Sequence, residues 1–335
     1  MAVFLSESDV QAAIKMPEAL AAIEAGFRDY AQGRATLLPR ISHLLPGGGG
    51  VFRILAATLP QKQMFGLKTL TGIPGKRLKN EIYFAILLFE TGSGALRTVV
   101  SANYLTGLRT GAASGLAAKY LAREDASTLG VVGSGVQAWY QAEALAHVRK
   151  IRSAKVFSRD KRNAEALALR LRETFSIDAL AVESAEEAVR GSSLVVAATT
   201  AASPVIEGAW LDPGTHVSSI GANSRTKREL DAACFARGRI VADSREQVLD
   251  ECGDLRDAVE AGVVGPDAVS AELGEVVAGL KPARTSPDEI TIFKSVGVAL
   301  QDIAVAVSAF DASQRRGLGT DLGSEAAILH PSVSP

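Results

Sequence analysis

The chain has 335 residues, of which 47% are hydrophobic and 22% charged, and its formal net charge at pH 7 is −1. A chain of this length can form two domains with a large core, and its near-neutral charge argues against a protein that binds nucleic acid or an anionic membrane surface. No apolar run approaches the length of a membrane span and the N-terminus lacks the basic-then-apolar order of a secretory signal, so we expect a cytoplasmic protein.

The first third of the sequence predicts a helix followed by an antiparallel sheet. Apolar residues at helical spacing indicate a helix that begins near Ser6 and includes Phe27, with Ser6 or Ser8 as its N-cap. Short apolar runs separated by Gly- and Pro-rich turns then predict strands, and an Ala- and Leu-rich segment predicts a long helix. We place the strands at 51–57, 64–70 and 83–90, and the long helix at 103–122.

The segment after this helix has the pattern of a dinucleotide-binding turn. The apolar residues 129–132 suit a buried strand and lead into Gly133-Ser134-Gly135-Val136-Gln137-Ala138, after which a helical pattern follows. Gly133 permits the tight turn, Gly135 lets a pyrophosphate approach the backbone, and Ala138 lets the helix pack close to the strand. We therefore expect a dinucleotide phosphate at the N-terminus of this helix, bound by Gly133, Ser134, Gly135, Val136 and Gln137.

From residue 128 onward, strand and helix patterns alternate as in the βαβ units of a parallel sheet. The sequence thus predicts an α/β fold in which a Rossmann-type, doubly wound parallel sheet, residues 123–297, is inserted into a smaller α+β domain formed by residues 1–122 and 298–335. We place further strands at 154–158, 179–182, 194–198, 215–220 and 239–242, helices at 161–174, 184–190, 228–236, 245–251 and 293–310, and a loose tail at 318–335.

The end of the second strand of this inserted domain indicates the preferred nicotinamide cofactor. Ser158 lies 25 residues after Gly133, close to where NAD-binding domains place an Asp or Glu on the ribose 2′-hydroxyl, and Arg159 follows it. A hydroxyl and a guanidinium suit a 2′-phosphate, and the missing carboxylate removes the repulsion that would exclude one. We therefore favour NADP(H), with NAD(H) as the alternative; in the other interpretation Arg159 is a solvated loop residue.

The cysteines and histidines point away from a metal site. Cys234 and Cys252 have neither metal-ligand spacing nor a thiol-redox pattern, so we expect free thiols, and the four histidines form no cluster.

Several segments together resemble the ornithine cyclodeaminase and mu-crystallin family. They occur in the family's order from about residue 37 to about residue 305. Besides the glycine motif, the matching segments are Pro39-Arg40, Gly66-Leu67-Lys68, Leu105 to Ser114, Val241 to Gln247, Glu251 to Leu255 and Ile292 to Gly297. The resemblance implies a homodimer in which the first domain carries dimerisation and substrate binding. It also implies cyclodeaminase, ketimine or pyrroline-carboxylate reductase, or alanine-type dehydrogenase activity.

Three cations are candidates for binding a small amino or imino acid. A carboxylate in a partly desolvated cleft is held by cations, and the family's carboxylate-binding residues match Arg40, Lys68 and Arg109. The two arginines present planar forks that suit a carboxylate. Lys68 lies in an apolar strand, where desolvation lowers the pKa of an ammonium and fits it for proton transfer to or from the substrate nitrogen. The alternative for each is a surface or structural ion-pair cation.

Further cofactor contacts follow from the resemblance. It places Thr110 at the pyrophosphate. In the alternative interpretation, the Thr110 hydroxyl forms a hydrogen bond with the backbone of its own helix. Thr199 follows a strand of the Rossmann sheet, where the loops meet the cofactor, and Ser295 to Gly297 match the family's nicotinamide-side segment. Ser295 is also a candidate N-cap for the last helix.

Two departures from the family pattern bear on the substrate. Aligning residues 227–230 with the family's Lys-Thr-Glu-Leu puts Asn223 where its cyclodeaminases carry an Asp, and an amide cannot act as a general base near neutral pH. Asn223 is also a common turn residue. Ile82-Tyr83 stands where many relatives have His-Gln.

The leading hypothesis is an NADPH-dependent reductase of small cyclic or linear imino acids, or an amino-acid dehydrogenase in reverse. The second is a cyclodeaminase that recycles a bound NAD, acts on ornithine or lysine and releases ammonia. Asn223 and Arg159 both argue against it. The third is a non-catalytic, crystallin-like protein that binds cofactor or ligand, against which the retained Lys68, Arg40 and Arg109 argue.

Overall fold

The computed structural model describes residues 2–46, 50–73 and 81–323. These residues divide into two compact units, one made of Met1–Arg109 with Val298–Pro335 (unit 1) and the other of Thr110–Gly297 (unit 2). The first junction falls inside helix α3, Asn103–Leu121, whereas the sequence-based boundary after residue 122 lies at the far end of that helix. The second junction follows Gly297, as in the sequence-based division.

Unit 1 is built on an eight-stranded sheet in the order β16-β1-β7-β6-β5-β4-β2, with β3 also paired to β4. Neighbouring strands from β2 to β7 are antiparallel, as the sequence predicts, whereas β1 pairs with β7 in parallel. The strands are β1 Val3–Leu5, β2 Thr36–Leu37, β3 Ile41–Leu44, β4 Val51–Leu59, β5 Met64–Ile73, β6 Glu81–Glu90, β7 Leu96–Ser101 and β16 Thr320–Asp321. β16 belongs to the expected tail, whose residues 324–335 lie outside the described part.

The predicted N-terminal helix is divided in two. Ser6 caps α1, Glu7–Ala13, through a reciprocal pair of hydrogen bonds with Asp9. Pro17 lies in the first turn of α2, Met16–Ala31, where a missing N–H costs nothing, but the same proline could not continue an earlier helix. The prediction of one continuous helix is therefore wrong.

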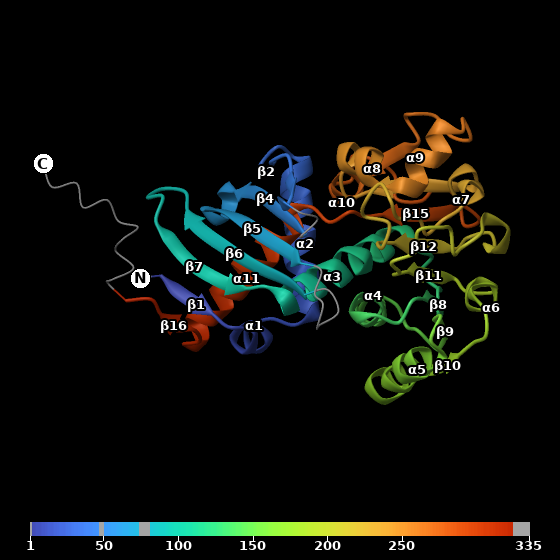
Figure 1. Ribbon diagram of the computed structural model, residues 1–335, viewed down its shortest axis with the longest axis horizontal. Coiled ribbons are helices and arrows are strands. Elements are labelled where there is room, and N and C mark those ends of the chain that lie inside the picture. The colour runs from blue at the N-terminus through green and yellow to red at the C-terminus, as the bar shows by residue number, and fades with distance from the viewer. Residues whose placement is uncertain (1, 47–49, 74–80, 324–335) are drawn as a thin grey trace, which may run out of the picture. The chain divides into compact units, whose positions relative to one another are not determined.

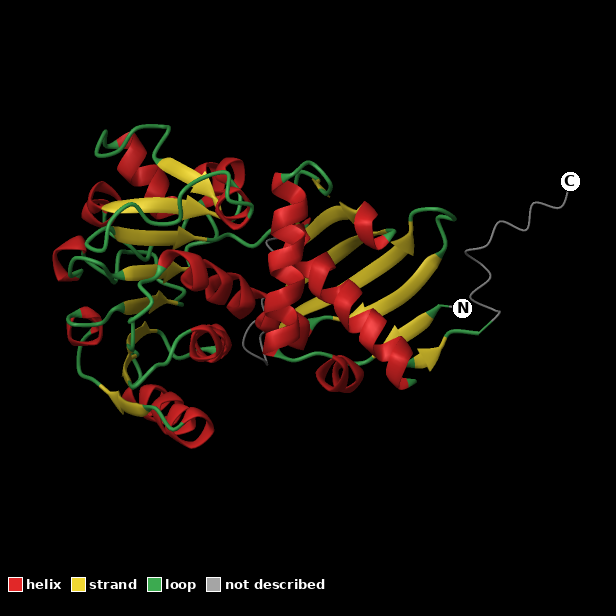
Figure 2. Cartoon of the chain, turned by 180° about the vertical axis from the view of Figure 1, so that it is seen from behind, coloured by secondary structure: helices red, strands yellow, loops and turns green. Residues whose placement is uncertain are grey.

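The last helix, α11, spans Ala299–Arg316 and packs with α2 over one face of the unit 1 sheet, as Figure 2 shows from the helix side. The prediction of a helix from residue 293 is wrong at its start, because Ile290–Lys294 forms strand β15. A short apolar run does not distinguish a buried strand from a buried helix, and all five residues of β15 are buried.

Unit 2 is a parallel sheet in the order β10-β9-β8-β11-β12-β15-β13-β14, with helices on its faces (Figure 1). This confirms the doubly wound Rossmann-type fold; the sequence patterns missed β14, β15, α9 and α10. The strands are β8 Thr128–Val132, β9 Ser153–Phe157, β10 Asp178–Ala181, β11 Leu194–Ala197, β12 His216–Ser219, β13 Gly238–Ala242 and β14 Val269–Glu272. The helices are α4 Val136–Val148, α5 Lys161–Phe175, α6 Ala185–Val189, α7 Ala232–Arg237, α8 Arg245–Glu251, α9 Gly253–Glu260 and α10 Leu273–Val277. In the described part of the chain, no helix is long and apolar enough to cross a membrane.

Candidate functional site

The turn between β8 and α4 in unit 2 is built on Gly133 and Gly135. Gly133 has a φ of 115°, and a Cβ there would lie 2.3 Å from the Ala198 carbonyl oxygen, so only glycine fits. Gly135 is the N-cap of α4 and makes no side-chain cap, and a Cβ built on it would meet nothing within 4 Å. The next residue, Val136, is 72% exposed. The first turn of this 13-residue helix is thus open to an anionic group, which the helix dipole attracts.

Ser158 and Arg159 lie at the end of β9, beside this turn. The Ser134 hydroxyl lies 2.8 Å from that of Ser158, which ties the glycine turn to the end of the strand. Arg159 is exposed. Its neighbours Arg162 and Lys161 form ion pairs with Asp160 and Glu183, whereas no acidic partner of Arg159 is found among the described residues.

One buried carboxylate organises the loops that follow β11 and β12. Glu229 Oε1 accepts hydrogen bonds from the Thr199 backbone N–H at 2.6 Å and from the Thr199 hydroxyl at 2.9 Å. Its Oε2 accepts from the Ser219 hydroxyl and the Gly221 N–H, both at 2.8 Å. Glu229 is fully buried. It therefore fixes Thr199 and the start of the loop that carries Asn223.

A second buried carboxylate holds the segment after β15. Asp243 Oδ2 accepts from the Ser295 hydroxyl at 2.7 Å and from the Gly297 N–H at 2.8 Å. The N-cap of α11 is Val298, so the prediction that Ser295 caps this helix is wrong. The Ser295 side chain is bound to Asp243 instead, which fixes the backbone of this segment.

In unit 2, Asn223 forms a side-chain hydrogen bond and Thr110 forms a backbone hydrogen bond. The Asn223 amide oxygen accepts a hydrogen bond from Lys227 Nζ at 3.1 Å, which orients the amide within its loop. Thr110 is largely buried in α3, and its backbone carbonyl accepts from the Gln141 side chain at 3.1 Å.

In unit 1, the predicted lysine lies in a buried polar cluster. Lys68, on β5, is 1% exposed. Its Nζ donates to Asp302 Oδ1 and to Thr106 Oγ1, both at 2.8 Å, and lies 4.5 Å from the centre of the Phe84 ring. The ammonium is therefore desolvated but paired, which is the condition under which a lysine remains in a core.

Arg109, on α3, joins the same cluster. Its Nε lies 2.9 Å from Asp302 Oδ1 as an ion pair without hydrogen-bond alignment, and its Nη1 donates to Gln301 Oε1 at 2.5 Å. The same carboxylate oxygen thus contacts two of the three predicted cations.

The proton affinity of Lys68 reflects this environment. Burial lowers the pKa of the Lys68 ammonium from its usual 10.5 to about 8; the carboxylate of Asp302 opposes this shift, while the positive charges of Arg109 and Arg40 reinforce it. Arg40, in the connection between β2 and β3, therefore belongs to the same electrostatic environment. A pKa near the physiological range suits a group that exchanges protons with a substrate.

Sequence reasoning missed Asp302, Glu229 and Asp243. Asp302 lies in a helix that reads as apolar, and its partner Lys68 is 234 residues away in the sequence. A lone acid inside an apolar segment is the available signal, because a buried carboxylate requires a partner.

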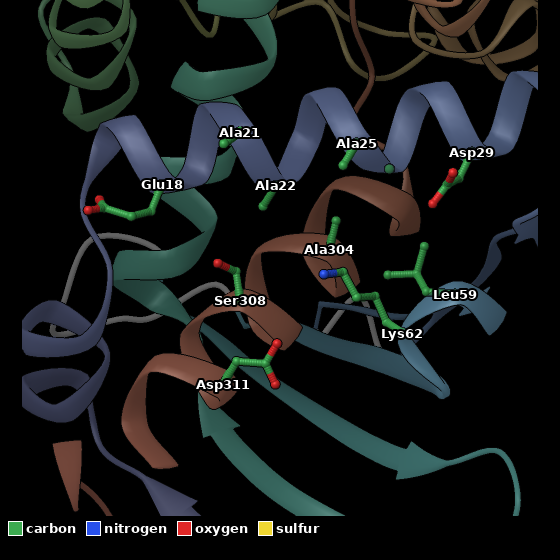
Figure 3. Close-up of a pocket in the computed structure, with 11 residues that line it drawn as sticks. Glu18, Ala21, Ala22, Ala25, Asp29, Leu59, Lys62, Ala304, Ser308 and Asp311 are labelled. Carbon is green, nitrogen blue, oxygen red and sulfur yellow. The ribbon is translucent and has the colours of Figure 1, made fainter. Parts of the chain in front are cut away.

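A cavity of about 300 Å³ lies between α2 and α11 (Figure 3). Alanines form much of its lining, and Lys62 and Asp311 stand at its sides. None of the predicted site residues lines it, so we do not place the site there.

The two cysteines and His216 of unit 2 are buried. Among the described residues, no group of three or more His, Cys, Asp or Glu side chains is arranged to hold a metal ion. Cys234 and Cys252 are buried free thiols, and burial raises the pKa of both. Burial also lowers the pKa of His216 to about 3, so its imidazole stays neutral.

Known proteins similar to this chain identify its family. The chain is 38% identical to alanine dehydrogenase of Archaeoglobus fulgidus over 320 residues, which is 95% of this chain and 97% of that protein. Its fold matches Thermococcus litoralis Δ1-pyrroline-2-carboxylate reductase in complex with NADH and L-proline, with a TM-score of 0.91, 36% identity, and coverage of 96% of this chain and 100% of that one. An archaeal alanine dehydrogenase dimer with bound NAD gives 0.90 and 36%, over 96% and 99%. The profile of the ornithine cyclodeaminase/mu-crystallin family matches residues 1–316, and the chain belongs to this family.

Proposed function

We propose that the protein is an NAD(P)H-dependent reductase of small α-imino acids, such as pyrroline- or piperideine-2-carboxylate or linear ketimines, and catalyses amino-acid oxidation in reverse. The observation that carries this proposal is the buried cluster in which Lys68 and Arg109 share Asp302. The open glycine turn of unit 2 supports a nicotinamide dinucleotide as the partner in the reaction. Relatives of similar length that act on pyrroline-2-carboxylate or alanine support the substrate class.

The two arginines and the lysine have different tasks. The guanidinium groups of Arg109 and Arg40 bind the substrate carboxylate, since planar forks match its two oxygens. The nicotinamide supplies a hydride to the carbon of the C=N bond when it is bound. Lys68 gives a proton to the substrate nitrogen, and in the reverse direction it accepts that proton. Its pKa of about 8 leaves mostly ammonium at pH 7 and lets the group act in both directions.

The cofactor contacts follow the loops of unit 2. The backbone of residues 133–137, with Thr110, binds the pyrophosphate, while Thr199, Ser295 and Gly297 contact the nicotinamide half. The exposed guanidinium of Arg159 and the hydroxyl of Ser158 favour NADP(H), with NAD(H) as the alternative. The two similar solved structures contain NADH or NAD, so a preference for NADP(H) would distinguish this chain from them.

The uncovered face of the unit 1 sheet supports a homodimer. α2 and α11 cover one face, whereas no described helix of this unit lies over the other, which faces the viewer in Figure 1. Half-buried apolar side chains extend across it, and Phe65 and Phe89 stack there with their ring centres 5.1 Å apart. An uncovered apolar sheet face of this kind is typical of a protein–protein interface, and we propose that a second copy of the chain covers it. The row across the sheet consists of Ala56, Leu67, Leu87 and Val99.

NADPH and NADH oxidation with a panel of substrates tests this proposal. The panel holds pyrroline-2-carboxylate, piperideine-2-carboxylate, and pyruvate with ammonia or methylamine. We expect turnover with at least one imino acid and no release of ammonia from L-ornithine, because Asn223 cannot act as the base that the cyclodeaminases place in this loop. Stoichiometric formation of proline and ammonia from ornithine would instead establish a cyclodeaminase.

A further inference from the structure

Asp302 is the acidic residue at the centre of the cation cluster, and it is fully buried. Its Oδ1 accepts a hydrogen bond from Lys68 Nζ at 2.8 Å and lies 2.9 Å from Arg109 Nε. The adjacent residue Gln301 accepts from the other side of the same guanidinium at 2.5 Å. Two consecutive residues of α11 thus fix the ammonium and the guanidinium next to each other.

The substrate class explains why these two cations must be neighbours. An α-imino acid carries its nitrogen and its carboxylate on the same carbon atom. A group that protonates the nitrogen and a group that binds the carboxylate must therefore lie side by side. Two buried positive charges at that spacing repel each other, and the repulsion is strong where water is excluded. A shared carboxylate oxygen offsets this repulsion.

We propose that Asp302 is the positioning residue of the site, which holds Lys68 and Arg109 at the spacing of the nitrogen and carboxylate of an α-imino acid. The charge of Asp302 also favours the protonated form of Lys68. The inference rests on the proposed function. Asp302 acts through the two cations and not on the substrate. Its Oδ2 is buried without a hydrogen-bond donor among the described residues, and the contacts with Lys68 Nζ and Arg109 Nε are both made by Oδ1.

The groups around Lys68 allow the direction of the effect to be derived. Arg109 on α3 and Arg40 before β3 are positive and lower the pKa of the ammonium. Arg53 on β4 is a further positive residue on the same face of the sheet as Lys68, because it pairs with Leu70, which lies two residues after Lys68 on β5. Thr106 and the Phe84 ring are uncharged. Asp302 is the acid that raises the pKa of Lys68, so its removal must lower that pKa further below about 8.

The test is the pKa of Lys68 in Asp302→Asn, read from the ¹³Cε resonance of isotopically labelled lysine and assigned by its loss in Lys68→Met. We expect the pKa to fall by about 1–3 units, the usual effect of an adjacent opposite charge. The alkaline limb of imino-acid reduction should move to lower pH by the same amount, and the Kd for NADPH should stay unchanged. Asp311→Asn makes the same chemical change elsewhere on α11, outside the cluster, and should leave the pKa of Lys68 unchanged.

Two further variants separate charge from structure. Thr106→Val removes a neutral partner of Lys68 at 2.8 Å and should shift its pKa by less than about 0.5 unit, since the charge pair remains. Asp302→Glu keeps the charge but displaces both cations, so KM for the imino acid should rise by about tenfold or more while the alkaline limb remains in place. The KM of Asp302→Glu tests the proposal even where the Asp302→Asn protein does not fold.

The outcomes distinguish this inference from the proposed function. A folded Asp302→Asn protein with an unchanged pKa of Lys68, or an Asp302→Glu protein with an unchanged KM, would overturn the role of Asp302. Failure of the wild-type protein to reduce any imino acid would overturn the proposed function, while the resonance of Lys68 would still report on the charge pair.

Discussion

Replacing Lys68 with Met removes the proposed proton donor with a small change in volume. Met keeps much of the apolar stem but supplies neither a charge nor a proton. General acid–base catalysis contributes about a hundred- to ten-thousand-fold, and we expect kcat for imino-acid reduction to fall by that factor. Binding of NADPH should be unchanged, because the glycine turn belongs to unit 2.

The structure also gives the expected cost in stability. Breaking a buried ion pair commonly costs about 3–5 kcal/mol, because one charge is left without a partner. Here Asp302 keeps Arg109 at 2.9 Å, so the carboxylate retains a counter-ion. The free energy of unfolding should therefore fall by only about 1.5–3 kcal/mol, the value of a hydrogen bond to a charged group. Urea unfolding of both proteins measures this difference.

The pH profile supplies the decisive readout. In the wild-type protein, reduction should decline as the pH rises through about 8, where Lys68 loses its proton, and amino-acid oxidation should increase over the same range. The Lys68→Met protein should show neither limb. Lys62→Met is the matched control, since Lys62 is an exposed lysine of the same unit, and it should behave as wild type. A folded Lys68→Met protein with wild-type kcat would refute the assignment of Lys68.

Three other changes test separate parts of the account. Arg159→Ala should weaken NADPH binding by about tenfold or more, the value of one charge-assisted contact of about 1.5–3 kcal/mol, and leave NADH nearly unchanged; equal losses in two fluorescence titrations would make Arg159 structural. Glu229→Gln places an amide N–H₂ against donors such as the Gly221 N–H, so KM for the nicotinamide cofactor should rise at least severalfold and the melting temperature should fall. An unchanged KM would show that Glu229 does not position the cofactor loops. Leu87→Asp puts a charge in the middle of the uncovered sheet face and should convert a dimer to a monomer by light scattering, whereas an unchanged mass would place the interface elsewhere.

Local patterns were sufficient for much of the fold. The glycine turn, the alternation of strand and helix and the Ser6 cap depend on neighbouring residues, and the structure contains all three. The errors arose where local patterns are ambiguous. Residues 290–294 form a fully buried strand whose apolar run merges with the helix after it, and Pro17 begins a new helix within an apparently continuous pattern.

The site depended more on distant contacts than the fold did. Arg40, Lys68 and Arg109 were selected by the family resemblance, and Lys68 also by its apolar strand. Asp302 could not be selected in this way, because its partner Lys68 lies 234 residues away in the sequence. Glu229 and Asp243 were also missed, and their partners Thr199 and Gly297 lie 30 and 54 residues away. Each carboxylate accepts hydrogen bonds from backbone N–H groups of a loop, and the residues next to the carboxylate in the sequence do not indicate this contact.

Transfer of deuterium from [4,4-²H₂]NADPH to pyrroline-2-carboxylate tests the central claim most directly. With purified wild-type protein, the account predicts L-proline that carries one deuterium at Cα, one NADP⁺ formed per proline, and loss of this product in Lys68→Met. Absence of labelled proline with the labelled forms of both NADPH and NADH, or proline formed from L-ornithine with release of ammonia and no net change in the cofactor, would contradict it.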